Sequence, residues 1–296
     1  MGNGVTARSL SEVTVNGLIT VGYDGTPGSA AAARWASREA GLRGLRVELL
    51  LAWPWTAPHL LGTPDAVAES RRWLARQEAG LRARSPGVDV TAVHRSGPAR
   101  DVLLAAAERS VVLALGSRGL GALHGYFVGA VGRDVLGRAA CPVVLVRADE
   151  EASRPAREVV LGLDLDHCCD AALRFAFEAA ALRAAPLRVV HAWRPPRGSG
   201  LVPAVTASLV RVAAAEAVQR FTGTLDPWRE EYPGVEVVPS LLRGGAAGTL
   251  VEAADRPDRL VVGRRTRGTL PGPLLGPVTQ AAVHHVRGPL AVVPCD

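Results

Sequence analysis

The sequence predicts an α/β protein made of two tandem doubly wound domains, each a five-stranded, mostly parallel sheet flanked by helices. Three observations support this fold class. The 296 residues, 48% hydrophobic and 21% charged, are enough for two modest domains. Short apolar runs alternate with segments of helical periodicity, and the second half repeats the first. We place the domains at residues 1–150 and 151–296, joined by a polar linker at Asp149–Pro155.

The repeat is visible as a self-alignment of the chain. Ile19–Asp24 aligns with Val159–Asp164 at an offset of 140 residues, and the helical segments that follow align at the same offset. Later the offset is 147, as in the pairing of Gly116 with Gly263. The difference falls between the second and third strands, so we expect a longer helix or loop there in the second copy.

The elements of the first copy follow in strict alternation. A β-branched strand ends in a Gly-x-Asp turn, and an alanine-rich stretch with apolar residues at helical spacing comes next. The remaining expected elements are a strand at Val47–Trp53, an amphipathic helix at Val67–Leu81, a strand at Val88–His94, a helix at Ala99–Arg109, a strand at Val111–Leu115, a glycine-rich loop, a helix at Val131–Arg138 and a strand at Pro142–Val146. In such a sheet, ligands bind beyond the carboxyl ends of the strands.

The charge composition excludes several kinds of site. The net charge is +6, and all 34 basic residues are arginine. Without lysine, the chain has no P-loop lysine for phosphates, no Schiff-base lysine and no lysine general base. The arginines are scattered and aromatic residues make up 4% of the chain, so nucleic acid is not an expected partner.

The distribution of apolar residues and cysteines favours a cytoplasmic protein. No window approaches eighteen consecutive apolar residues, so no membrane partner is expected, and the first twenty residues lack the pattern of a secretory signal. Four cysteines in this length do not form a disulfide framework, and the adjacent pair Cys168 and Cys169 cannot easily bridge to itself. A reducing compartment fits this usage. The run His167–Asp170 places its ligand types too close together for one tetrahedral metal ion, so no metal site is expected.

A glycine pattern follows the fourth strand of the first copy. Gly116-Ser117-Arg118-Gly119 is followed by nine residues and then by Gly129-Ala130-Val131, which opens a helix. Glycines let backbone amides approach a ligand, and a helix start carries unpaired amides with partial positive charge, so together they suit a polyphosphate without lysine. Asp24 ends the first strand at the same edge and can accept ribose hydroxyls. Two alternatives stay open: the glycines only form tight turns, and Asp24 and Asp164 only cap helices.

With the closing strand Ala140–Val146, these features resemble the universal stress protein family, and the duplication resembles its tandem members. The resemblance covers nearly the whole chain and implies the fold of the adenine-nucleotide alpha-hydrolase-like group. The family motif is Gly, two residues, Gly, nine residues, Gly and then Ser or Thr, and members that carry it bind ATP. The resemblance implies ATP, with Mg²⁺ as an optional companion, at Gly22, Asp24, Gly25, Thr26, Ala52, Gly116, Ser117, Arg118, Gly119, Gly129, Ala130 and Val131.

Both copies depart from the motif. Ala130 lacks the hydroxyl of Ser or Thr, and a hydrogen bond from such a group to a charged phosphate is worth about 1.5–3 kcal/mol. In the second copy, Thr266 replaces the second glycine, and Pro277 replaces Ser or Thr and removes an amide. We therefore expect ATP chiefly in the first copy. The corresponding, weaker residues of the second copy are Gly162, Asp164, Ala192, Gly263, Arg265, Gly276 and Val278.

Aromatic and charged residues outside the motif have simpler interpretations. Trp53-Pro54-Trp55 and Trp193 follow the second strands and are expected to cover the core edge more than a bound base. Arg71, Arg72 and Arg76, interleaved with Trp73, are expected to form the solvated face of an amphipathic helix. His284 and His285 are expected at the surface or in packing roles.

The expected function is that of a tandem universal stress protein that binds ATP and uses occupancy to set a conformation or a partner in the stress response. No carboxylate pair, lysine or metal cluster is evident to activate water, so the protein is expected not to be an enzyme, with at most slow hydrolysis. Two alternatives remain: a nucleotide-free interaction module, and an ATP-cleaving or adenylating enzyme of the same fold group. The two copies are expected to pair about a pseudo-twofold axis through their last strands, and the resemblance implies a further homodimer.

Overall fold

The computed structural model describes residues 17–53, 64–120, 123–127, 129–148, 158–194, 203–254, 257–265 and 275–295. Trp55, Thr266 and the segment 149–157, which holds the whole of the expected linker, lie outside these ranges. None of the helices within them is both long and apolar enough to cross a membrane.

The first copy alternates strands and helices as predicted. Its elements are β1 (Leu18–Gly22), α1 (Pro27–Arg43), β2 (Arg46–Trp53), α2 (Pro64–Arg84), β3 (Val90–Ser96), α3 (Ala99–Ala107), β4 (Val112–Leu120), β5 (Leu123–Phe127), α4 (Ala130–Arg138) and β6 (Val143–Arg147). The buried strands β1 and β6 carry almost only apolar side chains, which explains why the sequence shows continuous apolar runs there.

In its described residues, the second copy repeats this order except for β5. Its elements are β7 (Val159–Gly162), α5 (Asp170–Ala181), β8 (Leu187–Trp193), α6 (Pro203–Glu231), β9 (Val237–Arg243), α7 (Ala246–Ala253), β10 (Arg259–Arg265), α8 (Pro277–His285) and β11 (Leu290–Cys295). The 29-residue α6 corresponds to the 21-residue α2, so a longer helix absorbs the difference between the two offsets, as predicted.

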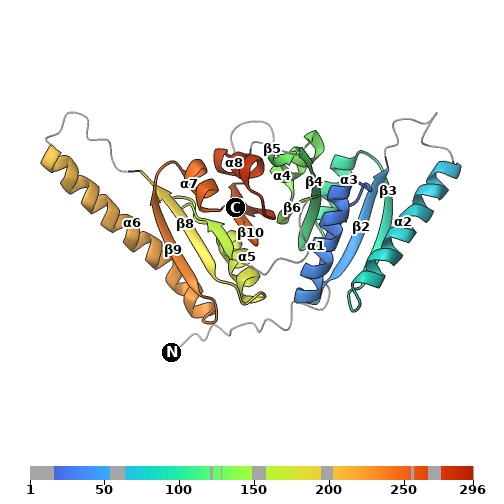
Figure 1. Cartoon of the computed structure of the whole chain (residues 1–296), viewed down its shortest axis with the longest axis horizontal. Coiled ribbons are helices and arrows are strands. Elements are labelled where there is room, and N and C mark those ends of the chain that lie inside the picture. Colours follow the sequence, from blue (N-terminus) through green and yellow to red (C-terminus); the bar gives the residue numbers. More distant parts are fainter. Residues whose placement is uncertain are drawn as a thin grey trace, which may run out of the picture.

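One continuous sheet runs through both copies in the order β3-β2-β1-β4-β6-β11-β10-β7-β8-β9. Within each copy the five strands of this order are parallel, which confirms the predicted fold class. At the centre, β6 and β11 pair antiparallel, with Leu145 opposite Leu290. The copies therefore join through their last strands as expected, and α2 and α6 lie at the two outer ends (Figure 1).

The expected glycine-rich loop is wrong for residues 116–127. β4 continues to Leu120 and pairs antiparallel with β5, with Arg118 opposite Phe127 and Leu120 opposite Leu123. The motif therefore begins on a β-hairpin. Glycines at positions 116, 119, 121 and 125 weaken the strand pattern in the sequence, which explains why the hairpin was not foreseen.

A cluster of charges is buried between the copies on the side of α1 and α5. We call Glu39, Arg43, Arg183 and Arg259 the Glu39 cluster. Both carboxylate oxygens of Glu39 accept from Arg259, at 2.7 and 3.3 Å, and one also accepts from Arg43 Nε at 2.6 Å. Arg183 is a further partner of Glu39. The Arg259 guanidinium also lies 4.9 Å from the ring of Trp35, so charge and aromatic packing both fix the contact between the copies.

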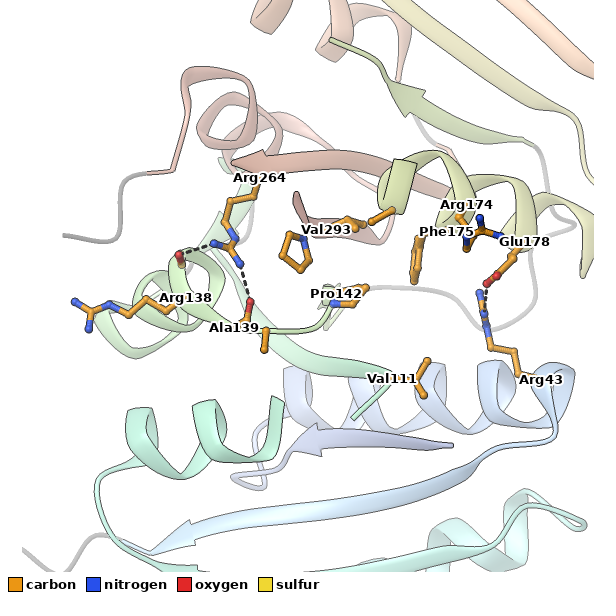
Figure 2. Close-up of a pocket in the computed structure, with 14 residues that line it drawn as sticks. Arg43, Val111, Arg138, Ala139, Pro142, Arg174, Phe175, Glu178, Arg264 and Val293 are labelled. Carbon is orange, nitrogen blue, oxygen red and sulfur yellow. Dashed lines mark hydrogen bonds and ion pairs between the residues drawn. The ribbon is translucent and has the colours of Figure 1, made fainter. Parts of the chain in front are cut away.

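A cavity of about 770 Å³ lies between the copies beside this cluster. Figure 2 shows Arg43 with Glu178 at one end of it and Arg264 at the other, with Pro142, Phe175 and Val293 between them. Arg264 donates to the carbonyls of Gly137 and Ala139, at the carboxyl end of α4, at 2.8 and 2.6 Å. This places a cation from the second copy at the negative end of a helix of the first. No residue predicted to bind nucleotide lines this cavity among those described.

Candidate functional site

A second cavity, of about 420 Å³, brings together most of the residues predicted for the first copy. It lies at the carboxyl ends of β1, β2, β4 and β6, where the strand order reverses between β1 and β4. Predicted residues that line it are Gly22, Asp24, Thr26, Ala52, Gly116, Gly129 and Val131. Other lining residues, not foreseen, are Tyr23, Ser29, Leu50, Leu51, Ala99, Leu103, Leu115, Gly132 and Leu145. The sequence thus located the polar rim, while the apolar wall comes from strand and helix residues with no motif.

A polar turn at the mouth of this cavity links β1 to α1. Asp24 Oδ1 accepts from the Thr26 amide at 3.0 Å and from the Thr26 hydroxyl at 2.7 Å. Thr26 is the N-cap of α1, and its hydroxyl accepts from the Ser29 amide at 3.2 Å. The alternative that Asp24 caps the helix is therefore wrong in detail, because Thr26 is the cap and Asp24 holds it in place. Asp24 also lines the cavity, so its carboxylate is placed to accept a hydrogen bond from a hydroxyl of a ligand.

The environment of the Asp24 side chain favours its ionised form. Burial alone would raise its pKa, but the hydrogen bonds from Thr26 outweigh burial and lower the pKa below its ordinary value. The site therefore presents a fixed carboxylate at neutral pH, which suits recognition of hydroxyl groups.

We expect Thr26→Ala to lower the free energy of unfolding by about 0.5–2 kcal/mol, because α1 loses its side-chain cap. Urea denaturation of the purified chain measures this. Thr26→Ser keeps the hydroxyl and serves as the matched control, expected to be close to the parent. Equal stability of all three proteins would contradict the capping role.

At two of the glycines that line the cavity, Gly22 and Gly116, there is no room for a side chain. A Cβ on Gly22 would lie 2.7 Å from a methyl of Leu115, and a Cβ on Gly116 would lie 2.1 Å from the carbonyl carbon of Gly28. The first turn of α1 therefore packs directly on the end of β4. Gly129 differs, since nothing lies within 4 Å of a Cβ placed there.

The amino end of α4 is open toward the cavity. Gly129 is its N-cap, and no side chain in the described part of the chain hydrogen-bonds there. The helix start lies against the cavity at Gly129, Val131 and Gly132. Unpaired amides at such an end favour an anion, so the residues present fit the phosphate end of a nucleotide.

Several predicted residues of the first copy lie elsewhere. Ser117 is buried, does not line the cavity, and its hydroxyl has no partner among the described residues. Ala130 begins α4 but is not among the lining residues. Gly25 has a φ of +81° and lies against Trp73, so it shapes the turn. Arg118 and Gly119 lie on β4 where it pairs with β5, and only their backbone is described.

Trp73 covers the turn from α2. Its ring lies 5.7 Å from that of Tyr23, whose hydroxyl donates to Gln77 at 3.0 Å. Arg71, Arg72 and Arg76 are exposed, as expected for the solvated face of this helix, whereas Trp73 between them is partly buried against the turn. Trp53 packs against the core with its ring 5.5 Å from His94, which confirms its role as core cover.

The equivalent turn of the second copy has a different network. Asp164 accepts from the Asp166 amide at 3.0 Å and lies 3.2 Å from His167 Nδ1. The other ring nitrogen of His167 lies 3.5 Å from Arg265. Asp166 in turn pairs with Arg220 of α6 at 2.9 Å. Two predicted site residues, Asp164 and Arg265, thus contact one histidine that replaces the small residues of the first copy.

A disulfide lies beside this turn. Cys169 bonds to Cys295, a single bridge that the sequence did not reveal, while Cys141 and Cys168 are free. Gly263 lies directly under it, with a Cβ there 2.7 Å from Cys295 Sγ. The pair is 126 residues apart, and local spacing carries no signal for such a contact.

The remaining predicted residues of the second copy hold structural positions. A Cβ on Gly162 would lie 2.6 Å from Leu250, Ala192 lies on β8 opposite Leu242, and Gly276 is the N-cap of α8. Val278 packs against the core. His284 and His285 are exposed. Among the described residues, no group of three or more His, Cys, Asp or Glu is placed to hold a metal ion.

Comparison with known proteins gives the same domain organisation. The model of the universal stress protein family matches residues 17–147 and 155–294. A universal stress protein of Mycobacterium tuberculosis is 30% identical over 292 residues, covering 93% of this chain and 95% of its own. The crystal structure of a universal stress protein from Archaeoglobus fulgidus has a TM-score of 0.72 at 15% identity and covers 94% of this chain and 98% of its own. Another protein of that organism, solved with dAMP, has a TM-score of 0.36 at 19% identity over 45% of this chain and 98% of its own.

Proposed function

The chain belongs to the universal stress protein family, as a tandem two-domain member, and on this basis we propose that its first copy binds ATP and acts as a nucleotide-dependent regulator of the stress response. The observation that supports this most is the 420 Å³ cavity, because it gathers seven of the residues predicted for ATP. Its size is within the range of small-molecule sites, roughly 300–1,000 Å³.

The parts of the cavity match the parts of the nucleotide. The apolar wall at Leu50, Leu51 and Ala52 suits adenine, and Asp24 suits the ribose hydroxyls. The open start of α4 suits the phosphates, with Mg²⁺ as an optional companion of the phosphates. The absence of a hydroxyl at Ala130 leaves backbone amides as the donors there.

We propose binding without efficient catalysis. The described residues of the cavity include one carboxylate, Asp24, and it is hydrogen-bonded to Thr26. Hydrolysis needs a group that activates water and a cation that neutralises the developing charge, so turnover is expected to be slow. The second copy is proposed as a weaker site, because His167 contacts both Asp164 and Arg265.

Isothermal titration of the purified chain with ATP tests the proposal. We expect Asp24→Ala to weaken binding by about tenfold to a hundredfold, because hydrogen bonds to a charged group are lost. Asp164→Ala, the same change in the other copy, is the matched control and is expected to leave the main binding event unchanged. Absence of heat with millimolar ATP would instead favour the nucleotide-free interaction module, and rapid turnover would favour an enzyme.

A further inference from the structure

The disulfide connects two parts of the second copy, the turn before α5 and the end of β11. Cys169 is the N-cap of α5 and follows the turn that begins at Asp164, and its sulfur accepts from the Ala172 amide at 3.4 Å. Cys295 is the last residue of β11, where it lies opposite Arg265 of β10. The bond therefore joins the end of β11 to the start of α5.

The first copy shows the same position without a bridge. Ser29 aligns with Cys169 at the offset of 140, and Ala148 aligns with Cys295 at the offset of 147. The Ser29 hydroxyl belongs to the Asp24 turn, since it donates to Thr26 O at 3.0 Å and lies 3.4 Å from the Asp24 amide. The fold therefore does not require the bond, and the second copy can be expected to stay folded when the two sulfurs separate.

The bond also covers the backbone that would face a ligand. Gly263 aligns with Gly116, which lines the cavity of the first copy. In the second copy, both sulfurs lie within 4 Å of a Cβ placed on Gly263. The two sulfurs therefore lie against the glycine whose counterpart, Gly116, lies against the backbone of Gly28 and Ser29 at the wall of the cavity.

The end of β11 pairs with one neighbouring strand, β10, whereas its beginning pairs with both β10 and β6. Beyond Val292, no residue of β11 is paired with β6 in the described register, and Pro294 has no amide to donate to β10. Cys295 is partly exposed, so a small dithiol can reach its sulfur. The bridge therefore joins a buried core residue, Cys169, to a partly exposed residue, Cys295, that packs against the same core.

We propose that Cys169 and Cys295 form a reversible dithiol–disulfide couple that closes the second copy when oxidised and frees its Asp164–Cys169 turn when reduced. In the reduction, the sulfur–sulfur bond breaks and each sulfur takes one electron and one proton. The dithiol that supplies them is oxidised to its own disulfide. Separation of the sulfurs uncovers Gly263 and lets the Cys169 side chain join the turn as Ser29 does in the first copy. The proposal does not depend on nucleotide binding.

Hydrogen exchange followed by mass spectrometry tests this on the full chain, oxidised and then incubated with dithiothreitol. Reduction is expected to speed amide exchange in residues 163–172 by about tenfold or more, with residues 23–32 unchanged as the internal reference. Cys295→Ser is expected to exchange fast under both conditions. Cys168→Ser, which alters the exposed neighbouring thiol, is the matched control and is expected to switch like the parent.

Three results would overturn the proposal: no Cys169–Cys295 peptide after oxidation, a bond that opens only when the protein is unfolded, or equal exchange in both states. ATP titration of the first copy under the same two conditions gives an independent readout. Equal affinity is expected there, so a failure of nucleotide binding can be told apart from a failure of the redox couple.

Discussion

Replacing Glu39 by glutamine is expected to lower the free energy of unfolding by about 3–5 kcal/mol. The variant leaves Arg259, whose side chain is 0% exposed, without its carboxylate partner. Arg183 loses the same partner and keeps Asp258, at 2.9 Å. Burying an uncompensated guanidinium is costly, so the contact between the two copies should be the first part of the molecule to weaken.

Urea denaturation, followed by tryptophan fluorescence, measures this effect, because Trp35 lies under Arg259. The matched control is Glu178→Gln, which removes an ion pair with Arg43 from a side chain that is 28% exposed. That change is expected to cost about 1 kcal/mol or less. Similar losses in the two variants would show that burial of the Glu39 cluster adds nothing.

The same cluster gives the protein a predictable response to acid. Burial alone would raise the pKa of Glu39, but the charges of Arg259 and Arg183 outweigh it and hold the pKa well below the ordinary value. A carboxyl with a depressed folded pKa contributes stability above its unfolded pKa and loses it as the pH falls through the folded one. The difference in stability between the parent and Glu39→Gln should therefore shrink below the ordinary carboxyl range.

Gly116→Ala is expected to destabilise the first copy by about 3 kcal/mol or more and to impair ATP binding. A Cβ there would lie 2.1 Å from the carbonyl carbon of Gly28 and 2.2 Å from the amide nitrogen of Ser29. Both neighbours are backbone atoms of the first turn of α1, so relief requires a shift of the helix. That shift would also displace Thr26 and Asp24.

Gly129→Ala is the matched control within the same motif. It has a φ of −63° and open space around a Cβ, so the change is expected to be neutral or to stabilise by up to about 1 kcal/mol. Thermal unfolding and ATP titration of both variants measure the contrast. Equal tolerance at the two positions would show that close packing of α1 on β4 is not what requires glycine at 116.

Much of the fold could be predicted because its signals are local. Apolar strands such as β6 and the self-alignment of the chain are visible in the residues themselves, and they led to the parallel sheet and to the pairing of β6 with β11. The β4–β5 hairpin could not be predicted in this way. Its register depends on pairing between Arg118 and Phe127 across a glycine-rich stretch that has little strand propensity of its own.

The residues of the candidate site also fall into those that local sequence signals predict and those that they do not. Asp24 and Gly129 could be located because strand ends and helix starts meet at one edge of a parallel sheet, whereas Thr26 was implied by the family resemblance. The place of Trp73 against this site was not foreseen, because helical periodicity does not reveal that a neighbouring turn with Gly25 will pack against it. The Cys169–Cys295 bond depends on a contact between residues 126 positions apart, which only the assembled sheet brings together.

The contact between Glu39 and Arg259 is not repeated on the other side of the pseudo-twofold axis that relates the two copies. In a symmetric pair, a contact between residues i and j is matched by one between j and i. The counterparts of Glu39 and Arg259 are Ala179 and Val112, both apolar and buried. Two detached first halves associating through this edge would bury Glu39 against valine, and two second halves would bury Arg259 against alanine. Because the two halves are covalently joined, each can carry a buried charge that the other half compensates. Self-association of two like halves through β6 or β11 is therefore disfavoured, because Glu39 or Arg259 would be buried without a partner of opposite charge.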